Sequence, residues 1–134
     1  MRYLLDTNAV IGLLKDTTSP LALRARRDDP RDVGLSSIVA HELYYGAFKS
    51  QRRAENLRRL DAIRFEVLPF DKEDAIAAGE VRATLAAVGS PIGPYDVLIA
   101  GQARARNLIL VTDNVREFER VKDLRLENWS AGGL

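Results

Sequence analysis

The feature that most constrains the fold is a short apolar run that ends at an acidic residue. Residues 3–5 (Tyr-Leu-Leu) are suited to a buried strand, and Asp6 interrupts the run. Thr7 and Asn8 follow as expected N-cap residues for an apolar helical segment over residues 9–14. A carboxylate at the end of a strand and ahead of a helix lies where ligands bind in open α/β sheets. A capping role alone would also account for Asp6.

Strand-like and helical segments alternate along the rest of the chain. Further strands are predicted at residues 33–36, 65–70, 108–111 and 124–126. Helices are predicted at residues 21–27, 38–48, 54–63, 72–88, 94–106 and 115–119. This alternation predicts an α/β fold, with a mostly parallel central sheet of about five strands flanked by helices on both faces.

Size and composition predict one domain spanning residues 1–134. With 46% hydrophobic and 29% charged residues, the chain has the means to bury a core. The absence of cysteine excludes disulfides, thiolate zinc sites and cysteine nucleophiles, and it fits a reducing cytoplasm, which is the expected location. Asp6 and Asn8 interrupt any N-terminal signal sequence, and no run approaches the roughly 18 apolar residues of a membrane span. We therefore expect no membrane association.

Acidic residues stand at four points that the predicted topology can bring to one edge of the sheet. Asp6 and the Asp113-Asn114 pair follow strands, whereas Glu42 and Asp96 lie on helices. Asp96 is in the first turn of its helix, where backbone N–H groups favour a carboxylate. Glu42 shares a helical stripe with apolar residues and therefore needs a partner or a cation.

Carboxylates gathered at one edge would repel each other strongly. A hard divalent cation between them removes this repulsion, and Mg²⁺ or Mn²⁺ prefers such oxygen ligands. The metal can also lower the pKa of a bound water and stabilise charge on a phosphoryl oxygen. The competing interpretation is that these acids are scattered caps and surface groups, because their spacing forms no local motif.

Four stretches of the chain resemble the PIN-domain ribonucleases and, more narrowly, the VapC toxins of type II toxin–antitoxin systems. These stretches are Leu4–Asn8, Ser36–Gly46, Ile92–Asp96 and Val111–Phe118. They occur in order and at family-like spacing, and the resemblance covers nearly the whole chain. The resemblance implies a PIN-like α/β fold and an endonuclease that hydrolyses RNA with Mg²⁺, for which Mn²⁺ can substitute.

The same resemblance assigns roles to individual residues. Asp6, Glu42 and Asp96 correspond to the acidic triad of the family and are the expected metal ligands and catalytic residues. The fourth family position is usually an Asp or Asn two residues after a threonine, which here is Asn114. Asp113 falls one place earlier, and we expect it to add negative charge nearby. Both stay in the set of catalytic candidates, and the sequence leaves open which of them supplies the fourth group.

Several polar residues adjoin these acids in the sequence. Thr7, Asn8 and Thr112 are candidates for hydrogen bonds that aim the carboxylates. His41 is the only histidine, and a general-base role would suit its chemistry. Adjacent helical positions do not face each other, so we do not expect His41 to act together with Glu42.

The expected partners also follow from the resemblance. They are a cognate VapB-type antitoxin that blocks the acidic site, a second copy of the chain in a homodimer, and an RNA substrate, with transfer RNA as the expected class. The net charge of +1 says little, but basic residues gather at 24–31 and 49–53. Such runs are usually solvated helix faces, yet beside an acidic site they could hold RNA phosphates.

Two other functions compete with the ribonuclease. A phosphatase of the haloacid dehalogenase type also has an Asp after its first strand, but its chemistry needs a second Asp where this chain has Asn8. The alternative that remains is a non-catalytic PIN-like module that binds RNA or protein. Such a module would be expected to lack one or more acids of the triad, whereas this chain has all three.

Overall fold

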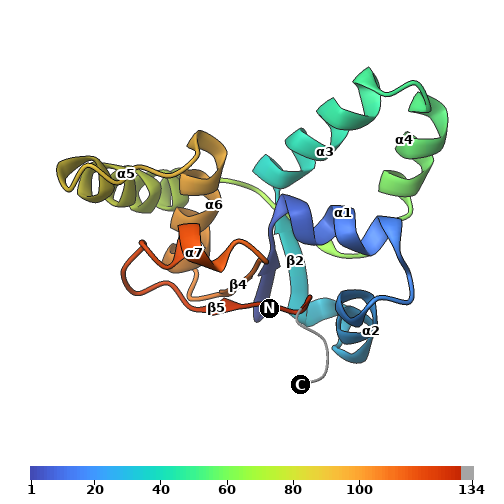
Figure 1. The fold of residues 1–134 in the computed structure, drawn as a ribbon, viewed down its shortest axis with the longest axis horizontal. Helices are drawn as coiled ribbons and strands as arrows, with labels where there is room; N and C mark the ends of the chain where they lie inside the picture. Colours follow the sequence, from blue (N-terminus) through green and yellow to red (C-terminus); the bar gives the residue numbers. More distant parts are fainter. Residues whose placement is uncertain (131–134) are drawn as a thin grey trace.

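The centre of the molecule is a five-stranded parallel sheet, seen in a computed structural model that describes residues 1–130 (Figure 1). The strand order is β3-β2-β1-β4-β5. The strands are β1 (Tyr3–Leu5), β2 (Val33–Ser36), β3 (Glu66–Leu68), β4 (Ile109–Val111) and β5 (Leu126–Glu127). The predicted α/β class is confirmed, and the sheet is parallel throughout. The last four positions of the predicted 1–134 domain lie outside the described residues.

Helices fill the connections between the strands, as predicted. They are α1 (Thr7–Lys15), α2 (Pro20–Arg27), α3 (Ser37–Lys49), α4 (Arg53–Asp61), α5 (Lys72–Ala87), α6 (Pro94–Ala105) and α7 (Val115–Phe118). A short 3₁₀ helix, η1 (Pro30–Asp32), was not predicted; Asp29 caps it and Pro30 begins it. The last strand also begins later than predicted, because Asp123 adopts a positive φ of 64° and the chain turns there. Within residues 1–130, no helix is long and apolar enough to cross a membrane.

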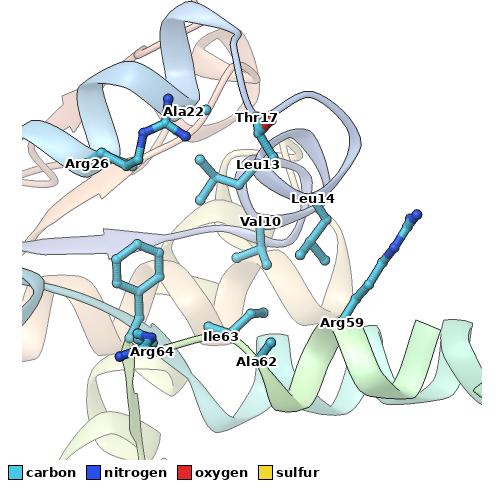
Figure 2. Close-up of a pocket in the computed structure, with 12 residues that line it drawn as sticks. Val10, Leu13, Leu14, Thr17, Ala22, Arg26, Arg59, Ala62, Ile63 and Arg64 are labelled. Atoms are coloured by element: carbon cyan, nitrogen blue, oxygen red, sulfur yellow. The ribbon is translucent and has the colours of Figure 1, made fainter. Parts of the chain in front are cut away.

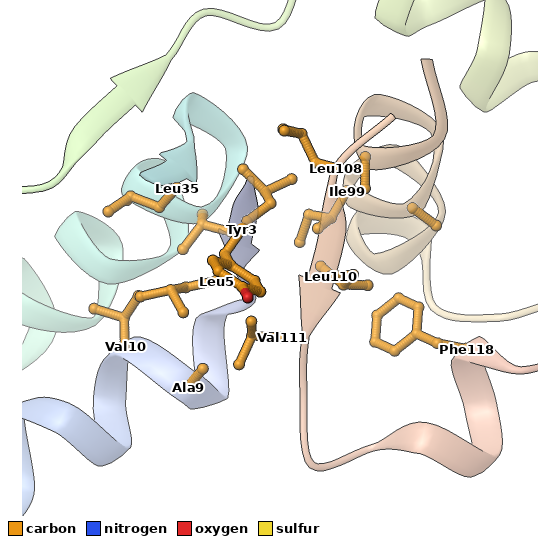
Figure 3. Close-up of a cluster of buried hydrophobic side chains, with 14 of the residues drawn as sticks. Tyr3, Leu5, Ala9, Val10, Leu35, Ile99, Leu108, Leu110, Val111 and Phe118 are labelled. Carbon is orange, nitrogen blue, oxygen red and sulfur yellow. The ribbon is translucent and has the colours of Figure 1, made fainter. Parts of the chain in front are cut away.

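The central strand β1 is buried on both faces. Tyr3, Leu4 and Leu5 are 3%, 0% and 0% exposed. Successive side chains of a strand point to opposite faces, so both faces of the sheet must be covered by helices. Figure 3 shows Val10 from α1 and Ile99 from α6 in the cluster that packs around this strand. The continuous apolar run at residues 3–5 is explained by this burial.

The register of the sheet brings the ends of three strands together. Leu5 pairs with Leu35 of β2 and with Val111 of β4. The Asp6 backbone N–H donates to the Val111 carbonyl at 3.1 Å, so the pairing continues to the acidic residue. Residues that follow β1, β2 and β4 therefore leave the sheet at the same carboxyl edge, which is where α/β proteins place their sites.

Close packing of α5 on α6 fixes the helix that carries Asp96. A Cβ added at Gly101 would lie 2.4 Å from the Ala78 Cα, so only glycine allows the two helices to approach this closely. Asp74 of α5 accepts two hydrogen bonds from Arg106, at 2.9 and 3.1 Å, just beyond the end of α6. The two helices are thus joined along their length, and the N-terminus of α6 is held at the carboxyl edge of the sheet.

Candidate active site at the carboxyl edge of the sheet

Asp6 ends β1 and caps α1. Its Oδ1 accepts a hydrogen bond from the Ala9 backbone N–H at 2.8 Å, and its backbone is extended, as N-cap residues require. The prediction that Thr7 and Asn8 serve as the caps is wrong, because α1 already begins at Thr7. Capping occupies one carboxylate oxygen of Asp6. The residue is 4% exposed, so the rest of the group needs its own partners.

The carboxyl group of Asp6 holds its proton more tightly than an exposed aspartate does. Burial raises the pKa of Asp6 to about 6, because desolvation penalises the charged form. Hydrogen bonds from Thr112 and from the Ala9 N–H favour the carboxylate and limit the rise. The negative charges of Asp113 and Glu42 raise the pKa further. A buried carboxylate with a pKa this near neutrality is typical of a functional site.

Glu42 reaches the same region from the second turn of α3. The Thr7 hydroxyl donates to Glu42 Oε1 at 2.8 Å, a contact between residues 35 positions apart. Glu42 is half-buried, and it lines a pocket together with apolar side chains such as Leu14 and Leu43. Thr7 and Thr112 thus donate to the carboxylates as predicted, whereas Asn8 is exposed.

Asp96 lies in the first turn of α6, directly after Pro94 begins the helix. Burial raises its pKa to about 7, and the charge of Glu117 and a hydrogen bond from the protonated carboxyl group to Glu117 are the next causes. The charges of Asp6 and Glu42 raise the pKa further. The three acids of the predicted triad therefore act on one another electrostatically, which the scattered-cap interpretation does not explain.

Glu117 is a member of this cluster that sequence reasoning missed. One of its oxygens accepts the Gly93 backbone N–H at 2.8 Å, and the other accepts the Asn114 side-chain amide. Glu117 thereby connects α7 to the loop before α6 and faces Asp96. The sequence does contain a signal for the contact with Asn114. Asn114 is followed three residues later by Glu117, which is the spacing of paired residues at a helix N-terminus.

Asp113 and Asn114 occupy different environments despite being neighbours. Asn114 is half-buried; its backbone N–H donates to Thr112 Oγ1 at 2.9 Å and its side chain donates to Glu117. Asp113 is exposed, and its charge raises the pKa of Asp6. Asn114 is therefore built into the hydrogen-bond network of the site, whereas Asp113 acts on it through charge.

The donor chemistry of this edge fits a hard divalent cation. Asp6, Glu42, Asp96 and Glu117 offer only oxygen ligands, and the charges that shift the pKa values of Asp6 and Asp96 are those of neighbouring acids. Within residues 1–130, no three Asp, Glu or His side chains form a ready-made metal cage. The cluster supplies the charge and the ligand type for a cation, and the exact ligand set is not preformed.

An acidic cluster at the carboxyl edge of a parallel α/β sheet defines the class to which the chain belongs. The PIN domain family model matches residues 3–124. The chain therefore belongs to the PIN-domain family.

Relatives and solved structures place the chain among the VapC ribonucleases of this family. The chain is 44% identical over 133 residues to the tRNA(fMet)-specific endonuclease VapC of Shigella flexneri, covering 97% of this chain and 99% of that protein. The crystal structure of DNA-bound VapBC from Salmonella typhimurium is similar with a TM-score of 0.92 and 42% identity, covering 96% of this chain and 98% of that one. VapBC2 from Rickettsia felis, bound to a promoter DNA fragment, gives a TM-score of 0.86 and 36% identity, covering 96% and 99%.

Proposed function

We propose that this chain is a magnesium-dependent endoribonuclease and the toxic component of a toxin–antitoxin pair. The observation that carries the proposal is the raised pKa of Asp6 and of Asp96, to which the negative charge of Glu42 on α3 contributes in both cases. Such a cluster lowers stability unless a ligand compensates its charge, and a nuclease supplies that ligand as a metal ion. The relatives named as VapC endonucleases support the same function.

Asp6, Glu42 and Asp96 would hold the metal, with Glu117 beside Asp96. When bound, Mg²⁺ would supply a positive charge for a phosphodiester oxygen and would lower the pKa of water. Thr7 fixes the orientation of Glu42, and Thr112 fixes that of Asp6. The acids would act as carboxylates in this state, and the near-neutral pKa values of Asp6 and Asp96 would fall because a cation would offset the repulsion between the carboxylates. Mn²⁺ prefers the same ligands and should substitute.

The proposed substrate is RNA, with transfer RNA as the favoured class. The Shigella relative is named for initiator transfer RNA, which supports this choice. Proteins cleave or read single-stranded loops more readily than RNA helices, because bases in a loop can be splayed out. We place the enzyme in the cytoplasm, where that substrate is found.

An apolar groove bordered by arginines suits the proposed antitoxin. The groove has a volume of about 480 Å³ and lies between α1, α2 and α4. Figure 2 shows Val10 and Leu14 of α1 facing Ile63 beyond α4. Arg26 and Arg64 lie at its border. We propose that an amphipathic antitoxin segment with acidic side chains docks here, because its apolar face would fill the groove and its charges would meet the arginines.

A second pocket connects this groove to the acidic cluster. It shares Leu14 and Arg59 with the groove and also includes Glu42. An antitoxin segment that leaves the groove along these residues would reach the metal site and block it. For the proposed homodimer, the exposed side chains of Tyr45 and Phe48 on α3, 61% and 52% exposed, offer an apolar surface.

The first experiment is cleavage of total cellular RNA by the purified, antitoxin-free protein. Mg²⁺ should yield discrete fragments, and EDTA or the Asp96→Asn substitution should abolish them. The fragment ends would identify the target. If folded protein produces no fragments with either Mg²⁺ or Mn²⁺, the non-catalytic binding module becomes the better description.

A further inference from the structure

Two aromatic rings meet at the border of the acidic cluster. The His41 ring of α3 and the Tyr95 ring of α6 have centroids 5.9 Å apart and are tilted by 55°. Both residues are exposed, Tyr95 by 44%. A tilted pair of rings does not cover both faces of either ring, so a flat surface remains open to a further flat group.

The position of the pair relates it to the reaction centre. His41 directly precedes Glu42, and Tyr95 directly precedes Asp96. Neighbouring helical side chains diverge by about 100° but differ in height by only about 1.5 Å. The rings therefore cannot point where the two carboxylates point, yet they stand at the same level of α3 and α6. The pair therefore lies beside the acidic cluster.

We infer that the His41–Tyr95 pair is a stacking platform for one nucleobase next to the scissile phosphate. The inference rests on the proposed ribonuclease function. Carboxylates repel RNA until a metal is bound, so a contact that does not depend on attracting phosphate would add affinity close to the acids. Stacking of a base on an aromatic side chain supplies such a contact, and it suits the unpaired bases of a loop.

A contact with another protein is the competing use of these exposed rings. His41 shares a helical stripe with Tyr45 and Phe48, which we assigned to the dimer surface. However, Lys49 Nζ covers the ring of Tyr45 at 4.8 Å from its centroid, whereas the contact of Tyr95 is made with His41 across two helices beside the acids. This placement next to Glu42 and Asp96 favours a substrate over a partner protein.

The test is a double-mutant cycle between Tyr95 and a nucleotide of the substrate. Once the cleavage site is mapped, the base on either side of it is removed to give abasic RNA. Wild-type kcat/KM should fall about tenfold or more on one of these RNAs. Tyr95→Ala should lose the same factor on intact RNA and little more on the abasic RNA, whereas Tyr95→Phe should stay near wild type.

Substitutions of His41 separate stacking from proton transfer. His41→Phe keeps a ring and should retain activity with an unchanged pH profile, whereas His41→Ala should lose activity on intact RNA only. If the loss from Tyr95→Ala and the loss from removing the base multiply, the ring and the base act independently, and the inference is overturned. A dissociated dimer in His41→Ala would also overturn it, because that result would point to a protein interface.

A binding assay keeps this inference separate from the proposed function. Single-stranded RNA that carries 2-aminopurine is titrated with the protein in EDTA, where no cleavage is expected. If the protein quenches the 2-aminopurine fluorescence and Tyr95→Ala loses this quenching, the platform is supported even if the wild type never cleaves RNA. Cleavage by the wild type together with quenching that is unchanged in Tyr95→Ala rejects the platform and leaves the nuclease intact.

Discussion

Asp6 and Asp74 are both buried aspartates that cap or begin a helix, but their charge environments are opposite. Asp6 is 4% exposed and Asp74 is 0% exposed. Burial raises the pKa of Asp6 to about 6, and neighbouring acids raise it further. Burial acts in the same direction on Asp74, but the Arg106 guanidinium and the Asp71 backbone N–H lower its pKa below the ordinary value. The difference lies in whether the fold supplies a positive partner.

This difference separates a structural acid from a functional one. Asp74 accepts hydrogen bonds from Arg106 and from Gln102, so its charge is satisfied within the protein. The charge of Asp6 is only partly satisfied, by hydrogen bonds from Thr112 and Ala9. The protein thus keeps an uncompensated negative cluster at the sheet edge, and a cation from solution can complete it.

The largest expected effect is on cleavage. Asp6→Asn keeps the size and the capping oxygen of the side chain but removes a charged metal ligand. We expect RNA cleavage at saturating Mg²⁺ to fall by about 10³-fold. The matched control is Asp113→Asn, which removes an exposed charge and should lower cleavage by less than about tenfold. Equal losses in the two variants would mean that Asp6 acts only through its negative charge and is not a metal ligand.

Loss of the paired aspartate should instead affect stability. Asp74→Ala leaves Arg106 without its main partner and removes several hydrogen bonds, so we expect the free energy of unfolding to fall by about 3 kcal/mol. Urea denaturation measures the change, and cleavage by the folded fraction should stay the same. Glu80→Ala, which removes a largely exposed partner of Arg104, should change stability by less than about 0.5 kcal/mol. If Asp74→Ala has only a small effect on stability, the contrast between Asp74 as a structural acid and Asp6 as a functional one is lost.

The two aspartates also predict opposite pH dependence. A raised pKa means that the folded state of Asp6 binds protons more tightly than the unfolded state, so metal-free stability falls as pH rises from about 4 to 7. Asp6→Asn should therefore stabilise the metal-free protein by about 1–2 kcal/mol at pH 7.5 and by nothing at pH 4. Asp74 contributes above its unfolded pKa and loses its contribution in acid. Denaturation curves in EDTA at several pH values test this, and destabilisation by Asp6→Asn at pH 7.5 would contradict it.

Glu117 tests how far the uncompensated cluster extends. Glu117→Gln keeps an oxygen for the Gly93 N–H but removes the charge next to Asp96. We expect Mn²⁺ affinity to fall by about tenfold, with the fold retained. Titration calorimetry measures the affinity. Unchanged affinity would place Glu117 among the structural acids, with Asp74.

The smallest expected effect concerns the basic residues at the start of α4. Arg52 and Arg53 are exposed, and Arg52 pairs only loosely with Glu55 at 3.8 Å. If both hold RNA phosphates, Arg52→Glu with Arg53→Glu should flatten the dependence of log affinity on log salt by about 1.4. Arg31→Glu is a suitable control, because η1 precedes β2 and lies at the opposite end of the strand from the acids. Identical salt slopes would exclude Arg52 and Arg53 from the RNA path.

Much of the fold could be predicted because it depends on local patterns. The apolar run at residues 3–5 is suited to burial on both faces, and Pro94 with Asp96 favours the start of a helix. The N-cap of α1 was misassigned by one residue, because Asp6 and Thr7 are both good caps and only the backbone angles distinguish them. Boundaries of this kind depend on hydrogen bonds that the sequence pattern does not specify.

The sequence alone determined the alternation of strands and helices and the placement of Asp6, Glu42 and Asp96 where that alternation can bring them together. Only the tertiary structure decided which acids remain without a positive partner. Asp74 and Glu117 both stand in the first turn of a helix and look equivalent in sequence. The fold places Arg106, 32 positions away, beside Asp74, and it places Asp96 beside Glu117. Charge compensation depends on distance in space, which local sequence does not encode.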